Sequence, residues 1–275
     1  MDQRHRNARA AGLEHLYHYA KFNPEYLHDS LSKRRVYCSD PADLNDPWDC
    51  RPWFDSDALD DPMLLEEFIA WIFSLTPTKP LSDEEVRAAQ GEIRANRTYR
   101  QEMLDRWSRE FLKTIPGRWR LYCLTPVPDS TLMWSHYANN HKGICLEFGL
   151  EHPVFGSALE VSYLSSYPKW SPNSLIQTGS YRVLLTKSDD WHYEREFRII
   201  CLSDGVNRPR ADLEGHPLVV KDGFLNLPTG SLRAVIAGCE ADFESIRAVV
   251  TAADPTLKVK RAVRSPHKYR LEIVE

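Results

Sequence analysis

The chain has 275 residues, with 35 Lys and Arg against 39 Asp and Glu, and its formal net charge is −4. This balance excludes a general nucleic-acid binder, and no apolar run approaches the roughly 18–20 residues that a membrane-spanning helix needs. The sequence has no internal repeat and no low-complexity linker, which favours a single domain over residues 1–275. Residues 1–12 carry charge with no apolar segment after them, so we expect no secretory signal there, and a flexible basic tail is one option for these residues.

The cysteine and glycine contents narrow the class of protein further. Six cysteines lie far apart with no Cys-x-x-Cys pair, which favours reduced thiols and a cytoplasmic protein. Glycine accounts for only 12 residues, and neither G-x-G-x-x-G nor G-x-x-x-x-G-K-[ST] occurs. A Rossmann or P-loop nucleotide site therefore has no support from local sequence.

The N-terminal third begins with strand-like and turn-like segments and continues into helices. Residues 15–20 read as a strand, Asn23-Pro24 begins a helix, and RRVYCS reads as the next strand. Residues 40–61 hold eight aspartates and form a polar loop. Residues 61–116 are predicted to form a helical insertion, in which Ser82 and Glu85 make a capping box.

From Leu121 onward the apolar pattern changes to strands. The predicted strands are RLYCLT, GICLEF, ALEVSYL, REFRIICL, HPLVVKDGFLNL, LRAVIAGC, LKVKRAV and YRLEIVE. Two helices are expected between them, in SLIQTGSYRVLLTK and ADFESIRAVVTAA. The predicted fold class is therefore α+β, a mostly antiparallel sheet with an N-terminal helical insertion.

The segment Trp191 to Ile200 carries the densest charge pattern. As a strand it places Glu194, Glu196 and Arg198 on one face, with Arg195, Phe197, Ile199 and Cys201 on the core face. Two carboxylates and a guanidinium on one face are either solvated or ion-paired, or they gather in a cleft where each tunes the pKa of the others. Lys187 and Trp191 precede them, which favours a site for a polar ligand.

Two aromatic segments contain further candidates. In residues 132–143 a short helix before Gly143 carries Trp134, His136 and Tyr137, and for Trp134 packing onto the sheet is the leading interpretation. In the strand 15–20, His18 shares a face with Leu16, opposite Tyr19. A histidine there is more often a hydrogen-bonded core residue than a ligand.

Two other polar segments have structural interpretations. The Asn-Asp-Pro turn in residues 44–49 bonds its own backbone, although its aspartates could also hold a divalent cation. The basic residues near the C-terminus are expected on a solvated face: Lys258, Lys260, Arg261, Arg264, Lys268 and Arg270.

Four segments taken together resemble the bacterial domain family of unknown function numbered 2971 (DUF2971). They are LYHY, LNDPWD, MWSHYANNHKGICLEF and KSDDWHYEREFRII, and they span about residues 15–240. More distantly, an early strand with a histidine, a middle aromatic position and a glutamate on a later strand are similar to the layout of ADP-ribosyltransferase-like folds. Those enzymes bind NAD without a Rossmann glycine loop.

The second resemblance implies roles for particular residues. Cleavage of the nicotinamide–ribose bond passes through an oxocarbenium-like transition state that needs a nearby carboxylate. In related transferases an E-x-E pair gives its second glutamate to NAD and its first to the acceptor, which implies Glu196 as the primary carboxylate and Glu194 as its companion. His18 would then bind a ribose hydroxyl. The implied NAD-binding residues are Tyr19, Trp134, His136, Tyr137, Lys187, Trp191 and Arg198, with Tyr137 or Trp134 on the nicotinamide and Arg198 or Lys187 on the pyrophosphate.

Three functional hypotheses stay open. The first is an NAD-consuming ADP-ribosyltransferase or NAD glycohydrolase with no metal, a toxin or antiviral defence effector whose acceptor is an unidentified protein or nucleic acid. The second is a metal-dependent phosphodiesterase or nuclease that uses Asp46, Glu194 and Glu196 as oxygen ligands. The third is a non-catalytic binding module, which a flat surface at Glu196 would favour and a polar cleft would disfavour.

Overall fold

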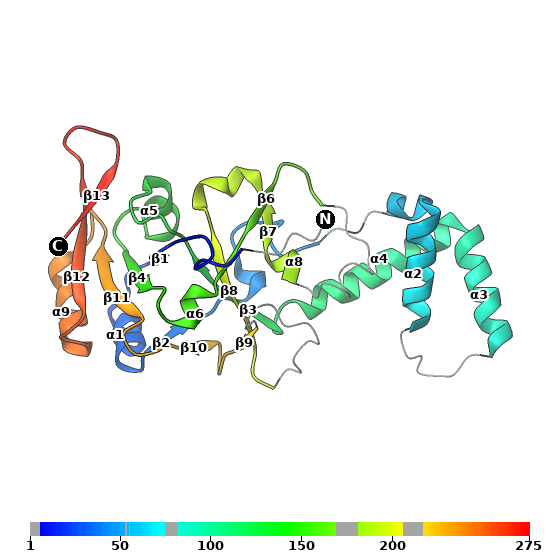
Figure 1. Cartoon of the computed structure of the whole chain (residues 1–275), viewed down its shortest axis with the longest axis horizontal. Coiled ribbons are helices and arrows are strands. Elements are labelled where there is room, and N and C mark those ends of the chain that lie inside the picture. The colour runs from blue at the N-terminus through cyan, green and yellow to red at the C-terminus, as the bar shows by residue number, and fades with distance from the viewer. Residues whose placement is uncertain (1–5, 53, 55, 75–81, 169–180, 206–216) are drawn as a thin grey trace.

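The computed structural model describes residues 6–52, 54, 56–74, 82–168, 181–205 and 217–275. Its architecture is the predicted α+β class, with two main sheets and a helical arm that extends away from them (Figure 1). The sheets lie near the C-terminal end of the long axis, and α2 and α3 lie at the opposite end.

The larger sheet has five strands in the order β1-β4-β11-β12-β13. Their bounds are β1 His15–Ala20, β4 Ile144–Gly149, β11 Leu232–Ala237, β12 Lys258–Arg264 and β13 Leu271–Val274. All neighbours are antiparallel except β11 and β12, which are parallel because helix α9 (Phe243–Ala253) makes the crossover between them.

The second sheet has the order β3-β8-β5, and β9 pairs with β8. Its strands are β3 Trp119–Leu124, β5 Leu159–Glu160, β8 Phe197–Leu202 and β9 Leu218–Val219. Two small ladders flank it: β2 (Arg35–Tyr37) with β10 (Phe224–Asn226), and β6 (Ser162–Leu164) with β7 (Thr186–Ser188). The two main sheets touch where Tyr17 and Thr125 exchange backbone hydrogen bonds of 2.7 and 2.9 Å.

The main core lies between these sheets. One continuous apolar cluster contains Leu16 and Phe148 from the larger sheet and Phe197 and Ile199 from the second. Helices α1 (Pro24–Ser32) and α9 complete it, and Asn23 caps α1 through its side chain as the Asn-Pro sequence predicts. Because β8 is buried along its whole length, a charged side chain on its other face must find partners inside the protein.

The helical arm contains the helices expected between residues 61 and 116. They are α2 Pro62–Ser74, α3 Asp83–Ala95 and α4 Arg97–Thr114, and two short 3-10 helices precede them, η1 Pro41–Asp43 and η2 Ser56–Asp60. The Ser82–Glu85 capping box is confirmed. A second apolar cluster with Phe68, Leu104 and Trp119 extends from the arm to β3.

In the described residues after β3, four short helices connect the strands: α5 Thr131–Tyr137, α6 Pro153–Gly156, α8 Tyr181–Leu184 and the 3-10 helix η3 Asp189–Glu194. The helix expected over residues 174–187 is only partly present. Residues 174–180 lie outside the described part, α8 covers four residues, and Thr186 already belongs to β7.

The prediction of a flexible tail over residues 1–12 is wrong for its described part. Ala8 is fully buried and its backbone N–H donates to Ala158, while Arg6 pairs with Glu160. Residues 1–5 lie outside the described residues.

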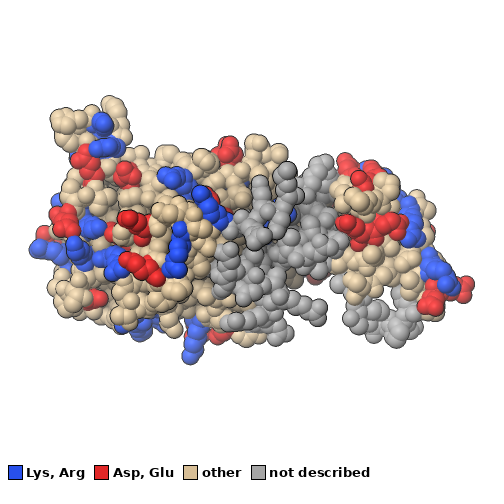
Figure 2. Space-filling model, viewed as in Figure 1, with Lys and Arg blue, Asp and Glu red and all other residues tan. Residues whose placement is uncertain are grey.

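The surface charges are mixed, as the composition indicates. Figure 2 shows basic and acidic side chains interspersed over the sheet end of the molecule. Several of the basic C-terminal residues are paired there: Lys258 with Glu275, Lys260 with Glu147 and Arg264 with Glu240. Among the described residues, no helix combines the length and the apolar character needed to cross a bilayer. All six cysteines are free thiols.

Candidate functional site

Five ionisable side chains meet in the interior, where β7, η3 and β8 face the aspartate-rich segment 40–61, which we call the acidic loop. They are Asp49, Lys187, Glu194, Glu196 and Arg198, and each is at most 6% exposed. We call them the charged cluster. Three carboxylates against two cations give the cluster a formal charge of −1 when all are ionised.

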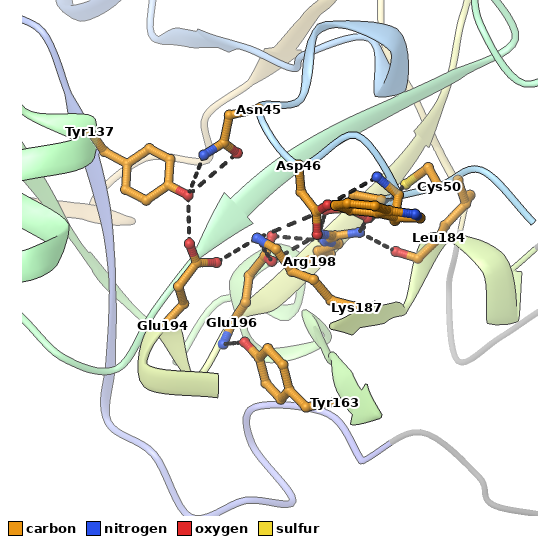
Figure 3. Close-up of polar contacts among 12 residues, drawn as sticks. Asn45, Asp46, Cys50, Tyr137, Tyr163, Leu184, Lys187, Glu194, Glu196 and Arg198 are labelled. Carbon is orange, nitrogen blue, oxygen red and sulfur yellow. Dashed lines mark hydrogen bonds and ion pairs between the residues drawn. The ribbon is translucent and has the colours of Figure 1, made fainter. Parts of the chain in front are cut away.

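Arg198 lies at the base of this cluster and is completely enclosed (Figure 3). Its guanidinium donates to both oxygens of Glu196 (2.7 and 2.9 Å), to both oxygens of Asp49 (2.9 and 2.5 Å) and to the Leu184 carbonyl (2.7 Å). An arginine has five N–H groups, so every donor already has an oxygen acceptor. Arg198 therefore orients Glu196 and Asp49, and it has no N–H left over for the pyrophosphate contact that the resemblance implies.

Lys187, Glu194 and Tyr137 continue the network toward the surface. Lys187 Nζ lies 2.6 Å from Glu194 Oε2, 3.4 Å from Glu196 Oε2 and 3.9 Å from the nearer oxygen of Asp49. The Tyr137 hydroxyl donates to Glu194 Oε1 at 2.5 Å, and the Asn45 amide donates to that hydroxyl at 3.2 Å (Figure 3).

The two glutamates reach the cluster through a local backbone distortion. The strand predicted to include Glu194 begins only at Phe197, since Glu194 ends η3. Between the glutamates, Arg195 adopts a left-handed conformation with φ of 48° and its side chain is exposed, which corrects the prediction that it faces the core. Left-handed non-glycine residues are uncommon and costly, and they often accompany functional sites.

The environments of the two glutamates drive their pKa values apart. Burial raises the pKa of Glu194, and the neighbouring charge of Glu196 raises it further. Burial alone would also raise the pKa of Glu196, but the charges of Arg198 and Lys187 hold it to about 2. Glu196 is thus fixed as a carboxylate, while Glu194 holds a proton more readily than an ordinary glutamate does. Such a separation is a hallmark of acid–base and charge-stabilising pairs.

A small cavity of about 80 Å³ opens onto the cluster between β1, β3 and α5. We call it the inner cavity. All five residues of the charged cluster line it, and Tyr17, His18, Tyr19 and Tyr137 supply its aromatic wall. A water molecule needs roughly 10–15 Å³ measured in this way, so the inner cavity has room for a group of about one ring.

His18 lies in the wall of the inner cavity. Its Nδ1 is 2.8 Å from the Cys123 carbonyl, its ring stacks on Tyr122, and burial lowers its pKa. A carbonyl only accepts, so Nδ1 carries the proton of the neutral ring and Nε2 is left as an acceptor. This arrangement suits the predicted bond from a ligand hydroxyl to His18.

The structure divides the other predicted aromatic residues into two groups. Tyr19 and Tyr137 line the inner cavity, although the Tyr19 hydroxyl already donates to Val127 at 2.7 Å. His136 is exposed and Trp191 is half-buried, with ring centroids 6.4 Å apart, and neither lines that cavity. Trp191 contacts the charged cluster at Lys187, whose Nζ lies over the Trp191 ring at 4.9 Å from its centroid.

Trp134 is a packing residue. It is fully buried, packs edge-on against Tyr19, and donates its Nε1 hydrogen to the Pro128 carbonyl. Its burial favours the packing interpretation over stacking on a ligand, because the ring is not exposed and does not line the inner cavity.

Asp49 is the member of the charged cluster that the sequence did not single out. The Asn-Asp-Pro turn was interpreted through its local bonds, and Asp46 does accept from the Trp48 backbone at 2.9 Å. Asp49 instead points inward to Arg198, which lies 149 positions later. One signal was available: an arginine on a buried strand requires acidic partners.

The metal hypothesis finds little support in these contacts. Lys187 and Arg198 already neutralise the carboxylates that would hold a divalent cation, and Asp49 rather than Asp46 joins them. In the described residues no group of three or more His, Cys, Asp or Glu side chains is arranged to hold a metal ion.

Comparison with known proteins bears on the same part of the chain. Residues 133–199 match the family described as a protein of unknown function, DUF2971. This match supports the family resemblance seen in the sequence, and it includes four of the five residues of the charged cluster. No curated protein matches the chain, and no solved structure does.

Proposed function

We propose that the charged cluster is the active site of an enzyme that cleaves an N-glycosidic bond, with NAD as its substrate. The observation that carries this proposal is the opposite displacement of the pKa values of Glu194 and Glu196 at one small cavity. A cavity at these side chains favours a ligand site over a flat docking surface, and its aromatic walls suit a planar ring.

Glu196 would stabilise the positive charge that develops on the ribose. The bond between ribose C1′ and the nicotinamide nitrogen breaks with its electron pair on nitrogen, so the leaving group departs neutral. The sugar then carries oxocarbenium character, which a fixed carboxylate in a water-poor cavity stabilises. The bidentate contact with Arg198 keeps Glu196 ionised and in one orientation.

Glu194 would act on the nucleophile. A water molecule or an acceptor hydroxyl forms the new bond to C1′ and must lose a proton, and a carboxylate with a raised pKa is a suitable base. Tyr137 and Lys187 hold Glu194 from two sides, and His18 Nε2 can accept a bond from a ribose hydroxyl. This division of roles agrees with the E-x-E order that the ADP-ribosyltransferase resemblance implies.

The test is release of nicotinamide from NAD by the purified full-length chain, measured by chromatography. We expect turnover by the native protein and a loss of at least about a hundredfold in Glu196→Gln, because one positioned charge contributes several kcal/mol to transition-state stabilisation.

Glu147→Gln is the matched control. Glu147 is also buried on a strand and paired with a lysine, but it does not line the inner cavity. Glu194→Gln gives a second variant should Glu196→Gln fail to fold, as judged by circular dichroism. Equal release by native protein and folded Glu196→Gln, or no release by native protein, would refute the proposal.

A further inference from the structure

A second cavity, of about 230 Å³, adjoins the inner cavity at Lys187. We call it the outer cavity. Lys187 lines both, and the adjacent residues Asp49 and Cys50 each line one of them. A ligand that extends out of the inner cavity past Lys187 would therefore meet the outer one.

Two exposed rings, those of Trp48 and Tyr167, belong to the wall of the outer cavity. Trp48 is 62% exposed and is the one exposed tryptophan in the described part of the chain. Trp48 contributes little to the core of the protein at that exposure, so its hydrophobic surface is available to a ligand.

Hydrogen bonds fix the backbone turn that carries Trp48 and tie the Tyr167 hydroxyl to it. The backbone N–H of Trp48 donates to the buried Asp46 carboxylate, and the backbone N–H of Arg51 donates to the Trp48 carbonyl. The Tyr167 hydroxyl donates to the Arg51 carbonyl. Because the backbone beneath Trp48 is fixed, only its side-chain torsions lose freedom when a ligand stacks on the ring.

The remaining lining of the outer cavity combines an apolar floor with polar groups. Val183 and Leu164 supply apolar surface, and the Asp190 carboxylate can accept from hydroxyl or amino groups. A volume of 230 Å³ is below that of typical pockets for drug-sized ligands and suits a base with part of its sugar.

We infer that the outer cavity binds the adenosine half of the dinucleotide, with the adenine stacked on Trp48. This inference rests on the proposed function, because the inner cavity has room for only the reacting ring and the rest of the substrate needs a neighbouring site. It assigns substrate selection to the acidic loop rather than to the E-x-E segment.

The test measures binding of adenosine monophosphate, which lacks the scissile bond, to the full-length chain by isothermal titration calorimetry. We expect binding by the native protein, at least about tenfold weaker binding by Trp48→Ala, and recovery to within a few-fold in Trp48→Phe, as for one base–aromatic stack. Tyr26→Ala, which removes an exposed ring on α1, is the control and should bind as the native chain does.

A kinetic measurement separates this inference from the proposed function. Trp48→Ala should raise KM for NAD with little change in kcat, and should leave cleavage of nicotinamide mononucleotide unchanged. Nicotinamide release from NAD without any binding of adenosine monophosphate, or equal binding by native chain and Trp48→Ala, would overturn the inference alone. Absence of nicotinamide release with Trp48-dependent binding would overturn the proposed function instead.

Discussion

Removal of Arg198 should destabilise the protein strongly, and the size of the effect follows from its contacts. In Arg198→Met, Lys187 is the cation that remains beside both carboxylates, 3.4 Å from Glu196 and 3.9 Å from Asp49. The formal charge of the cluster changes from −1 to −2 at a buried site. Removing one partner of a buried ion pair costs about 3–5 kcal/mol, and we expect a loss in that range at pH 7.

The pH dependence of this loss provides a sharper signature. In the native protein the pKa of Glu196 is about 2, below that of an unfolded glutamate, so its contribution to stability is full above about pH 4.5 and is lost as the pH falls toward 2. In Arg198→Met the pKa of Glu196 rises, so protonation relieves the repulsion. The difference in stability between native protein and variant should therefore shrink as the pH falls below about 5.

Urea unfolding followed by circular dichroism between pH 4 and pH 8 measures both effects. Arg94→Met is the control, because Arg94 makes an equally close pair with Glu66 on the exposed surface of the arm and should change stability little. A loss of less than about 1 kcal/mol for Arg198→Met at pH 7, or a difference that grows at lower pH, would refute the electrostatic account of the cluster.

Two further substitutions test residues around the cluster. Tyr137→Phe removes a hydrogen bond that lowers the pKa of Glu194, so the pKa of Glu194 should rise. The acidic limb of the pH profile of nicotinamide release should then move to higher pH. An unchanged limb would show that Glu194 is not the group that takes the proton. Trp134→Ala should cost about 3–5 kcal/mol in urea unfolding, as expected for a large buried ring. The same variant should keep the native KM for nicotinamide mononucleotide, and a specific rise of that KM with little loss of stability would contradict the packing role.

Local patterns in the sequence predicted much of the fold because their causes are local. The capping box of α3, the Asn23 cap of α1 and the alternation along β8 each depend on neighbours within a few residues. Alternation placed Glu196 and Arg198 on one face, and they do meet there. It also grouped Glu194 with them, although the structure reaches that result through η3 and a left-handed Arg195 rather than through a strand.

The composition of the site depended on contacts that no local pattern carries. Asp49 joins Arg198 across 149 positions, and only the folded chain reveals that both are buried. Charge type alone could not distinguish an arginine that binds a ligand from one whose five donors are consumed internally. Likewise, an aromatic residue on a short helix gives no sign of whether its ring faces the core, as for Trp134, or lines a cavity, as for Tyr137.

The most direct measurement of the central claim is release of nicotinamide from NAD by the native chain, beside Glu196→Gln and Glu147→Gln under identical conditions. The account predicts release by native protein and Glu147→Gln and a loss of at least about a hundredfold in Glu196→Gln. Release that is unaffected in folded Glu196→Gln, or absent from the native protein, would contradict it.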